Sequence, residues 1–187
     1  VGLTQAGVIT ATSLDVTNSA STVALTNNAN SLANVEIDNT GRNVSLTNSA
    51  AMNISAGGIQ GDSVVLNTAG LTQTGAITAT SLDVTNSAGS VVLTNAANSL
   101  ADVEIDNTGN SISLTNTSLT DISSGGIQGS FVTLNTVGLT QTGTIDASAK
   151  LTVTNTQGDV TLTQLNSLAA IEIVNPLGVI DVKSTES

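Results

Sequence analysis

The chain has 187 residues, of which 39% are hydrophobic and only 9% are charged, with one Phe and no Trp, Tyr, His or Cys. Fourteen carboxylates against three basic residues give a net charge of −11, which excludes binding to nucleic acid or anionic membrane surfaces, because so few cations cannot neutralise rows of phosphates. The hydrophobic content predicts a folded chain, and no apolar run reaches the roughly 18 residues that membrane insertion as a helix requires.

From the N-terminus onward, the chain is built from short phrases such as LDVTN and VEIDN, in which apolar side chains alternate with polar ones and Asn closes the phrase. This period of two is that of a β-strand with one buried face. Clusters of Asn, Gly and Ser between the phrases are typical of turns. In chain order, the predicted strands begin at Leu14, Val23, Val35, Val44, Val64, Leu82, Val91, Val103, Ile112 and Val132.

A longer repeat contains these phrases, because GLTQ recurs at Gly2, Gly70 and Gly138. The chain therefore divides into copies at 2–69 and 70–137, which share most of their residues, and an incomplete copy at 138–187. Every second phrase recurs at a shorter spacing, as from Val23 to Val44. Self-similarity at such periods is the signature of stacked repeats, and each copy is predicted to make three windings, two of about 21 residues and one of about 26.

These periods predict an all-β fold, a parallel β-helix or β-solenoid of about eight windings of roughly 20–26 residues, formed as a single unit by residues 1–187. A winding cannot bury its apolar side alone, so successive windings stack about 4.8 Å apart in parallel register and share a continuous core. The register places Leu14 over Val35 and Val23 over Val44. An antiparallel sandwich is the alternative, but its strands need not recur in register.

The Asn that closes each phrase also recurs at a fixed phase. An Asn at a corner tolerates unusual backbone conformations and can pass amide hydrogen bonds to the next Asn. We therefore predict a structural ladder of stacked side chains, with a role as simple turn residues as the alternative. The predicted pairs are Asn18 over Asn39, Asn27 over Asn48, Asn86 over Asn107, and Asn95 over Asn116.

Nearly the whole chain resembles the repeat regions of filamentous-haemagglutinin-like exoproteins, through the segments GLTQTGAITATSLDVTNSAGSVVLTNAANSL and EIDNTGNSISLTN. Those exoproteins are the large passengers of two-partner secretion systems, and autotransporter passengers look similar. The resemblance implies a right-handed parallel β-helix. It also implies an extracellular or outer-surface fibre of a Gram-negative bacterium, used for adhesion or cell contact. The family's secretion-domain motifs are not in this sequence, so the export route stays open.

Acidic residues recur in pairs on the predicted outer surface. Asp15 and Glu36 occupy the same place in two consecutive windings and should lie side by side, as should Asp83 and Glu104. Two such carboxylates repel by about 1 kcal/mol in water. A calcium ion could offset the repulsion by binding several oxygens, which makes these four residues weak calcium candidates. A solvated acidic face that keeps the rod soluble is the favoured interpretation.

A second calcium pattern is present only in part. GGIQGDSVV, from Gly57, is similar to the calcium-binding nonapeptide, but Gln60 stands where that pattern requires Gly, and Ser130 replaces the Asp in the second copy. That motif acts in tandem, whereas this segment occurs singly in each copy. Its glycines are better interpreted as a tight corner that needs positive φ. In the third copy the acidic pair is lost, and Glu172 is predicted to face Thr152.

No constellation of catalytic residues is predicted, and no cofactor. Carboxylate pairs on a β-helix are also found in polysaccharide lyases and hydrolases, but glycosidase chemistry needs two carboxylates flanking a bound sugar ring. Ser and Thr are abundant, yet no residue is positioned to activate one as a nucleophile. The segment ITATS presents outward Thr pairs suited to ice binding, at Thr10 with Thr12 and at Thr78 with Thr80, but only once in three windings.

The sequence is therefore expected to encode a non-enzymatic repeat shaft of a large secreted or cell-surface adhesin fibre. The alternative is a binding module whose outer face engages polysaccharide, calcium or ice. Expected partners are a second copy of the chain, joined end to end, or a glycan or protein on the surface of a host or neighbouring cell.

Overall fold

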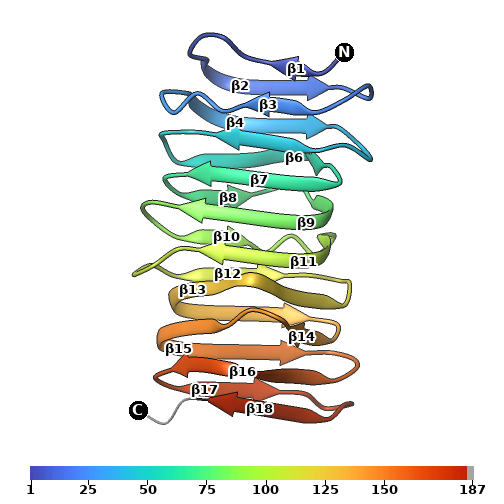
Figure 1. The fold of residues 1–187 in the computed structure, drawn as a ribbon, viewed down its shortest axis with the longest axis vertical. Coiled ribbons are helices and arrows are strands. Elements are labelled where there is room, and N and C mark those ends of the chain that lie inside the picture. The colour runs from blue at the N-terminus through green and yellow to red at the C-terminus, as the bar shows by residue number, and fades with distance from the viewer. Residues whose placement is uncertain (185–187) are drawn as a thin grey trace.

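The computed structural model describes residues 1–184, and over that range it contains eighteen strands and no helix. A helix able to span a membrane is thus not found in this range. Figure 1 shows the strands stacked in layers along one long axis, with the two termini at opposite ends. The strands are β1 (Leu3–Thr4), β2 (Thr10–Thr17), β3 (Val23–Leu25), β4 (Ser31–Asp38), β5 (Val44–Thr47), β6 (Met52–Gln60), β7 (Ser63–Thr68), β8 (Leu71–Gln73), β9 (Ile77–Asn86), β10 (Val91–Leu93), β11 (Ser99–Asp106), β12 (Ile112–Thr115), β13 (Thr120–Thr136), β14 (Leu139–Gln141), β15 (Ile145–Asn155), β16 (Val160–Leu168), β17 (Ile171–Val174) and β18 (Ile180–Ser184).

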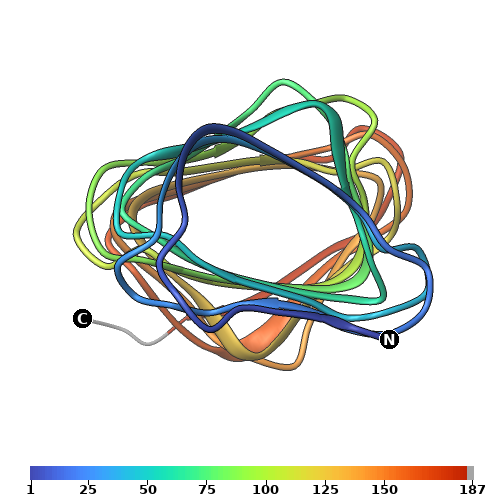
Figure 2. The ribbon, with the colours of Figure 1, turned by 90° about the horizontal axis from the view of Figure 1, so that it is seen from above.

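The strands pair in parallel, usually with the second strand along the chain. β2 pairs with β4 and β3 pairs with β5, so consecutive strands lie on opposite sides of a coil. Seen along the axis, the chain traces a flattened ring (Figure 2). The molecule is a β-solenoid of about 9 turns, which confirms the predicted fold class.

The turns are shorter and more even than expected. Paired residues are 18 positions apart from Val64 to Leu82 and 21 positions apart from Val23 to Val44. The longer winding that was expected once in each copy is therefore replaced by shorter turns. This difference accounts for a coil of about 9 turns in place of the eight expected.

Successive copies of the long repeat alternate between the two sides of the coil. Leu14 pairs with Val35 in β4, and its counterpart Leu82 pairs in the same way with Val103 in β11. Leu82 also pairs with Val64 in β7, which places it in the column of Val23 and Val44, on the other side of the coil from Leu14. One copy thus covers about three and a half turns. The same surface consequently faces opposite directions in neighbouring copies.

The core consists of columns of aliphatic side chains that run through the middle of the coil. Val23, Val44 and Val64 stack on one another and are fully buried. The predicted register of Leu14 with Val35 is also present. Each buried aliphatic side chain contributes about 1.5–3 kcal/mol relative to exposure, and the turn above provides that burial.

A glycine corner turns the chain sharply in each of the first two copies. Gly58 and Gly126 have φ values of +79° and +82°, which residues with a Cβ rarely adopt. A Cβ on Gly58 would lie 2.1 Å from the carbonyl oxygen of Ala76, one turn further along. Close stacking and the backbone conformation together explain the predicted tight corner in GGIQG.

Candidate functional site

Asparagine amides join successive turns inside a corner of the coil that lies on opposite sides in the first and second copies. Nδ2 of Asn18 donates to Oδ1 of Asn39 at 2.8 Å, and Nδ2 of Asn86 donates to Oδ1 of Asn107 at 2.7 Å. Asn39 and Asn107 are fully buried, so these hydrogen bonds satisfy polar groups inside the solenoid. At this corner each copy has one such rung, formed in the third copy by Asn155 and Asn175 at 3.1 Å, and the rungs do not form a continuous ladder.

The other two predicted pairs have different partners. Asn48 exchanges hydrogen bonds with the backbone of Leu32, at 2.7 and 3.0 Å, and Oδ1 of Asn27 accepts from the backbone of its own turn. Asn30 occupies the buried position at this corner. Within residues 1–184, no hydrogen bond joins the side chains of Asn27 and Asn48, and the second copy repeats this arrangement at Asn95, Asn98, Leu100 and Asn116.

A reciprocal pair of amides, which sequence reasoning missed, explains the Gln of GLTQ. Nε2 of Gln73 donates to Oδ1 of Asn98 at 2.9 Å, while Nδ2 of Asn98 donates to Oε1 of Gln73 at 2.8 Å. Oδ1 of Asn98 also accepts from the backbone N–H of Ile77. The partners lie more than one turn apart in the sequence, so the recurrence of GLTQ was the available signal. The same exchange occurs at Gln5 with Asn30 and at Gln141 with Asn166.

The predicted acidic pairs lie in register on the outer side of the strands. Asp15 pairs with Glu36 between β2 and β4, and Asp83 pairs with Glu104 between β9 and β11. Among the described residues, no three acidic side chains come close enough to hold a metal ion. The geometry brings the two carboxylates of each pair together but adds no third acidic ligand.

Glu36 already has a local role at the glycine corner. The backbone N–H of Gly57 donates to Oε2 of Glu36 at 3.0 Å, and a Cβ on Gly57 would lie 1.7 Å from Oε1 of that carboxylate. In the second copy, Glu104 lies equally close to Gly125. Both glutamates therefore fold over a glycine of the next turn.

The pKa values of two carboxyl groups, Asp83 in the second copy and Glu172 in the third, are shifted in opposite directions. Burial raises the pKa of the Asp83 carboxyl above its ordinary value, because a partly buried site disfavours the charged form. Glu172 accepts a hydrogen bond from Nζ of Lys150 at 2.5 Å, and this contact together with the charge of Lys150 lowers the pKa of Glu172. Glu172 pairs with Thr152, as expected from the sequence.

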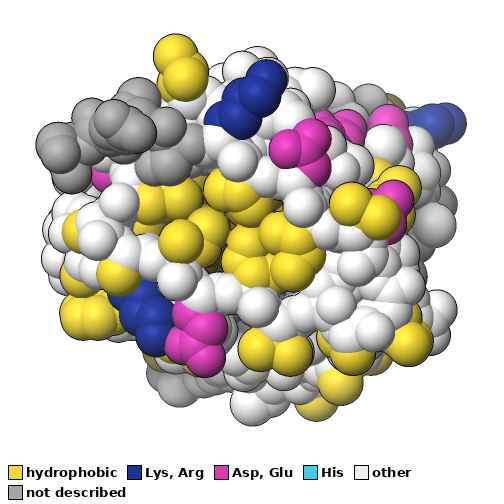
Figure 3. Space-filling view, turned by 90° about the horizontal axis from the view of Figure 1, so that it is seen from below, with side chains coloured by type: hydrophobic (Ala, Val, Ile, Leu, Met, Phe, Trp, Pro, Cys, Tyr) yellow, Lys and Arg dark blue, Asp and Glu magenta, His cyan; other side chains and the backbone are white. Residues whose placement is uncertain are grey.

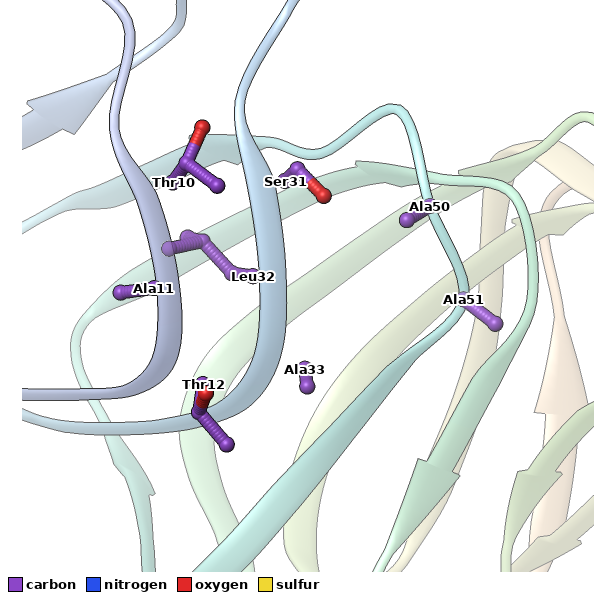
Figure 4. Close-up of a pocket in the computed structure, with 8 residues that line it drawn as sticks. All are labelled: Thr10, Ala11, Thr12, Ser31, Leu32, Ala33, Ala50 and Ala51. Carbon is purple, nitrogen blue, oxygen red and sulfur yellow. The ribbon is translucent and has the colours of Figure 1, made fainter.

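A shallow groove crosses one narrow edge of the coil in the first copy. It has a volume of about 410 Å³ and lies between β2, β4 and the segment that connects β5 to β6. Thr10 and Ser31 occupy paired positions on its adjacent strands, and Ala33 and Ala50 line the other part (Figure 4). Hydroxyl groups beside small apolar side chains can exchange hydrogen bonds with a polar chain lying in the groove.

The same groove recurs in the second copy on the opposite edge of the coil. It has a volume of about 370 Å³, and its wall includes Asp62 between β6 and β7, whose Oδ1 accepts from the hydroxyl of Thr80 at 2.8 Å. In the third copy the corresponding hollow, at Asp146 and Ser148, measures only about 50 Å³. The groove is therefore a feature of the two regular copies. Residues that line the second groove are Gly41, Gly61, Asp62, Thr78, Ala79, Thr80, Ser99, Ala101 and Ser118.

The stacked turns, buried amide pairs and repeated edge groove define a β-solenoid repeat protein. Comparison with known protein families, curated proteins and solved structures found no match to this chain.

Proposed function

We propose that this chain is a non-enzymatic segment of the shaft of a large secreted or cell-surface fibre, of the filamentous-haemagglutinin-like kind. The support for this proposal is the way in which each turn depends on its neighbours. Core columns, strand ladders and amide exchanges all run from one turn to the next, as from Val44 to Val64 and from Gln73 to Asn98. A structure of this kind extends by adding turns without needing a new core.

The surface chemistry is consistent with such a role. The carboxylates of Glu36 and Glu104 fold against glycines of the next turn, and the chain contains no His or Cys. A net charge of −11 keeps such rods apart in solution. Export to the outer surface of a Gram-negative cell belongs to the same proposal and is supported by the repeat resemblance.

A length measurement tests the shaft proposal. Insertion of a second 70–137 copy into the chain adds about three and a half turns, and at about 4.8 Å per turn the rod should lengthen by about 17 Å. Small-angle X-ray scattering reports this as a larger maximum dimension with an unchanged cross-section. A thicker particle with little added length would contradict the proposal, as would turnover of glycans by the purified chain.

The edge groove supports a second candidate function, the binding of a polysaccharide. The groove recurs with nearly the same lining in two copies and offers hydroxyls at Thr78, Thr80 and Ser99. Glycan-array binding tests this function with the double variant Thr78→Val and Thr80→Val, and Thr152→Val on a strand outside the groove is the control. Loss of binding in the groove variant alone would support polysaccharide recognition, and equal binding by all three proteins would contradict it.

A further inference from the structure

A second hollow in the first copy adjoins the edge groove. It has a volume of about 390 Å³, and Ala33 and Ala51 line both the groove and this hollow. The two alanines lie on adjacent turns (Figure 4), close to Asn34 and Asn53, which pair between β4 and β6. The edge groove therefore continues along the axis of the coil, over the turns that carry β6, β8 and β10.

This axial hollow combines open space with groups that form hydrogen bonds. Gly70 and Gly89 add no side chain to its lining, and Ala51 adds only a methyl group. Thr72 and Ser90 are exposed and line the same hollow. A hydroxyl can both donate and accept, so a ligand that carries a small apolar group next to a polar one fits this lining.

The lining is also free of charge. The charged side chains that are visible from below lie around the outside of the coil and not in its apolar middle (Figure 3). Charge is thus a property of the outer surface, yet none of the residues that line the edge groove of the first copy or the axial hollow is charged. An uncharged ligand suits such a lining, because it brings no charge that would need a partner.

In the second copy a leucine covers the corresponding place. Leu119 stands where the first copy has Ala51, and Gly138 stands where it has Gly70. A Cβ on Gly138 would lie 2.7 Å from Cδ1 of Leu119, so the leucine methyl lies directly over this glycine. In the first copy, a Cβ on Gly70 would meet only the Cβ of Ala51, at 3.2 Å. The second copy therefore shows a methyl group seated where the first copy is open.

We propose that the first copy binds an uncharged polysaccharide that carries acetyl groups. The sugar chain lies in the edge groove, and an acetyl methyl lies over Gly70, as the methyl of Leu119 lies over Gly138. The polar atoms of the acetyl group can exchange hydrogen bonds with the hydroxyls of Thr72 and Ser90. This inference rests on the second candidate function, polysaccharide binding, and names the class of sugar that the first copy selects.

The strands beside the groove favour a sugar chain over a peptide. An extended peptide binds a sheet by adding a strand to an open edge. Here β4 is already paired with β2 and β6, and β8 is already paired with β6 and β10. A sugar chain needs no open edge, because a few placed polar groups beside apolar contacts are enough to orient a ligand.

Two tetrasaccharides with the same linkage isolate the contribution of the acetyl group. Chitotetraose carries acetamido groups where cellotetraose carries hydroxyls, and both are uncharged. In isothermal titration calorimetry, the unmodified chain should bind chitotetraose about tenfold more tightly, the lower end of what a methyl-sized group contributes in an apolar pocket. Ala51→Leu places the residue of the second copy in the axial hollow. It should abolish the preference and leave the affinity for cellotetraose unchanged.

The reverse substitution should create a site. Leu119→Ala opens the second copy next to its own edge groove, so the number of chitotetraose molecules bound with the higher affinity should double. Leu165→Ala is the matched control, because Leu165 and Leu119 are exposed to a similar extent, 69% and 61%. It should bind like the unmodified chain. Far-UV circular dichroism checks that all variants keep their β-sheet.

The outcomes separate this inference from the function on which it rests. Equal affinity for the two tetrasaccharides would overturn selection of acetyl groups and leave polysaccharide binding standing. A preference for chitotetraose that survives Ala51→Leu would overturn the assignment to the axial hollow. Failure of the unmodified chain to bind either tetrasaccharide would contradict polysaccharide binding and this inference together.

Discussion

Gln73 and Asn98 exchange two side-chain hydrogen bonds across consecutive turns, at 2.9 and 2.8 Å. Asn98 is fully buried, and Nδ2 also donates to the carbonyl oxygens of Leu93 and Thr115. One amide therefore connects three segments of backbone through the interior of a corner. Because buried amides are costly when their partners are removed, this pair determines how firmly two turns are held together.

Substitution within this pair should weaken the solenoid. Gln73→Leu should lower the free energy of unfolding by about 1–3 kcal/mol, because Asn98 loses its reciprocal partner. Asn98→Leu should cost more, since it also removes partners from the backbone of Ile77 and Leu93. Chemical denaturation measures both variants, and Gln157→Leu at an exposed turn should change stability by less than about 0.5 kcal/mol. Equal effects of all three would contradict this role.

The two glycines of the GGIQG corner should differ in their tolerance of a methyl group. At Gly57 the added Cβ meets the flexible carboxylate of Glu36, whereas at Gly58 it meets the backbone of Ala76 at 2.1 Å and requires φ of +79°. Left-handed backbone alone costs about 1–2 kcal/mol for a residue with a side chain. Gly58→Ala should therefore lower the thermal midpoint more than Gly57→Ala.

A double variant checks the cause at Gly57. Adding Glu36→Ala should restore most of the stability that Gly57→Ala loses, because the obstructing carboxylate is then absent. Adding Glu36→Ala to Gly58→Ala should restore no stability, because the obstruction there is the backbone of Ala76. Recovery in both backgrounds, or in neither, would contradict the contacts described at this corner.

Asp83 should make stability depend on pH. Burial raises the pKa of its carboxyl above 3.8, the ordinary value, so the folded chain binds this proton more tightly than the unfolded chain. The resulting contribution to stability is fully present below the unfolded pKa and is lost as pH rises through the higher folded pKa. Asp83→Asn should therefore gain stability relative to the unmodified chain at pH 7 and lose that gain near pH 3.

Denaturant unfolding between pH 3 and pH 7 measures this difference. Thr152→Asn is the control, because Thr152 occupies the corresponding strand position in the third copy and has no titrating group. The free energy of unfolding of Thr152→Asn should differ from that of the unmodified chain by the same amount at every pH in this range. A constant difference for Asp83→Asn as well would show that burial does not affect this carboxyl.

Removal of calcium should leave the solenoid unchanged. Glu36 bonds to the backbone of Gly57, and no cluster of three acidic groups is found in residues 1–184. Calorimetric scans with EDTA and with millimolar calcium should give the same melting temperature. A clear drop in EDTA would contradict this expectation and show that the folded chain binds calcium, since a ligand that binds the folded state raises its stability.

Sequence periodicity predicts the strands and the columns well, because alternation and recurrence report directly on the buried face. The pairing of Leu14 with Val35 follows from the spacing of the repeated phrases alone. Periodicity does not distinguish the two sides of a coil, however. The sequence therefore did not predict that Leu14 and its counterpart Leu82 lie on opposite sides. Corner amides were only partly predictable, since backbone geometry determines that Asn30, and not Asn27, lies inside.

The most direct test of the stacked coil uses the absence of cysteine from the chain. Ala24 and Ser45 are paired on adjacent turns, and Ser45 is paired in turn with Val65. Adjacent parallel strands lie about 4.8 Å apart, within reach of a disulfide, whereas two turns exceed the roughly 7 Å limit. Oxidation should therefore close the bridge in Ala24→Cys with Ser45→Cys but not in Ala24→Cys with Val65→Cys, as measured by mass spectrometry of the monomer. Closure of the second pair, or failure of the first, would contradict a parallel coil with this register.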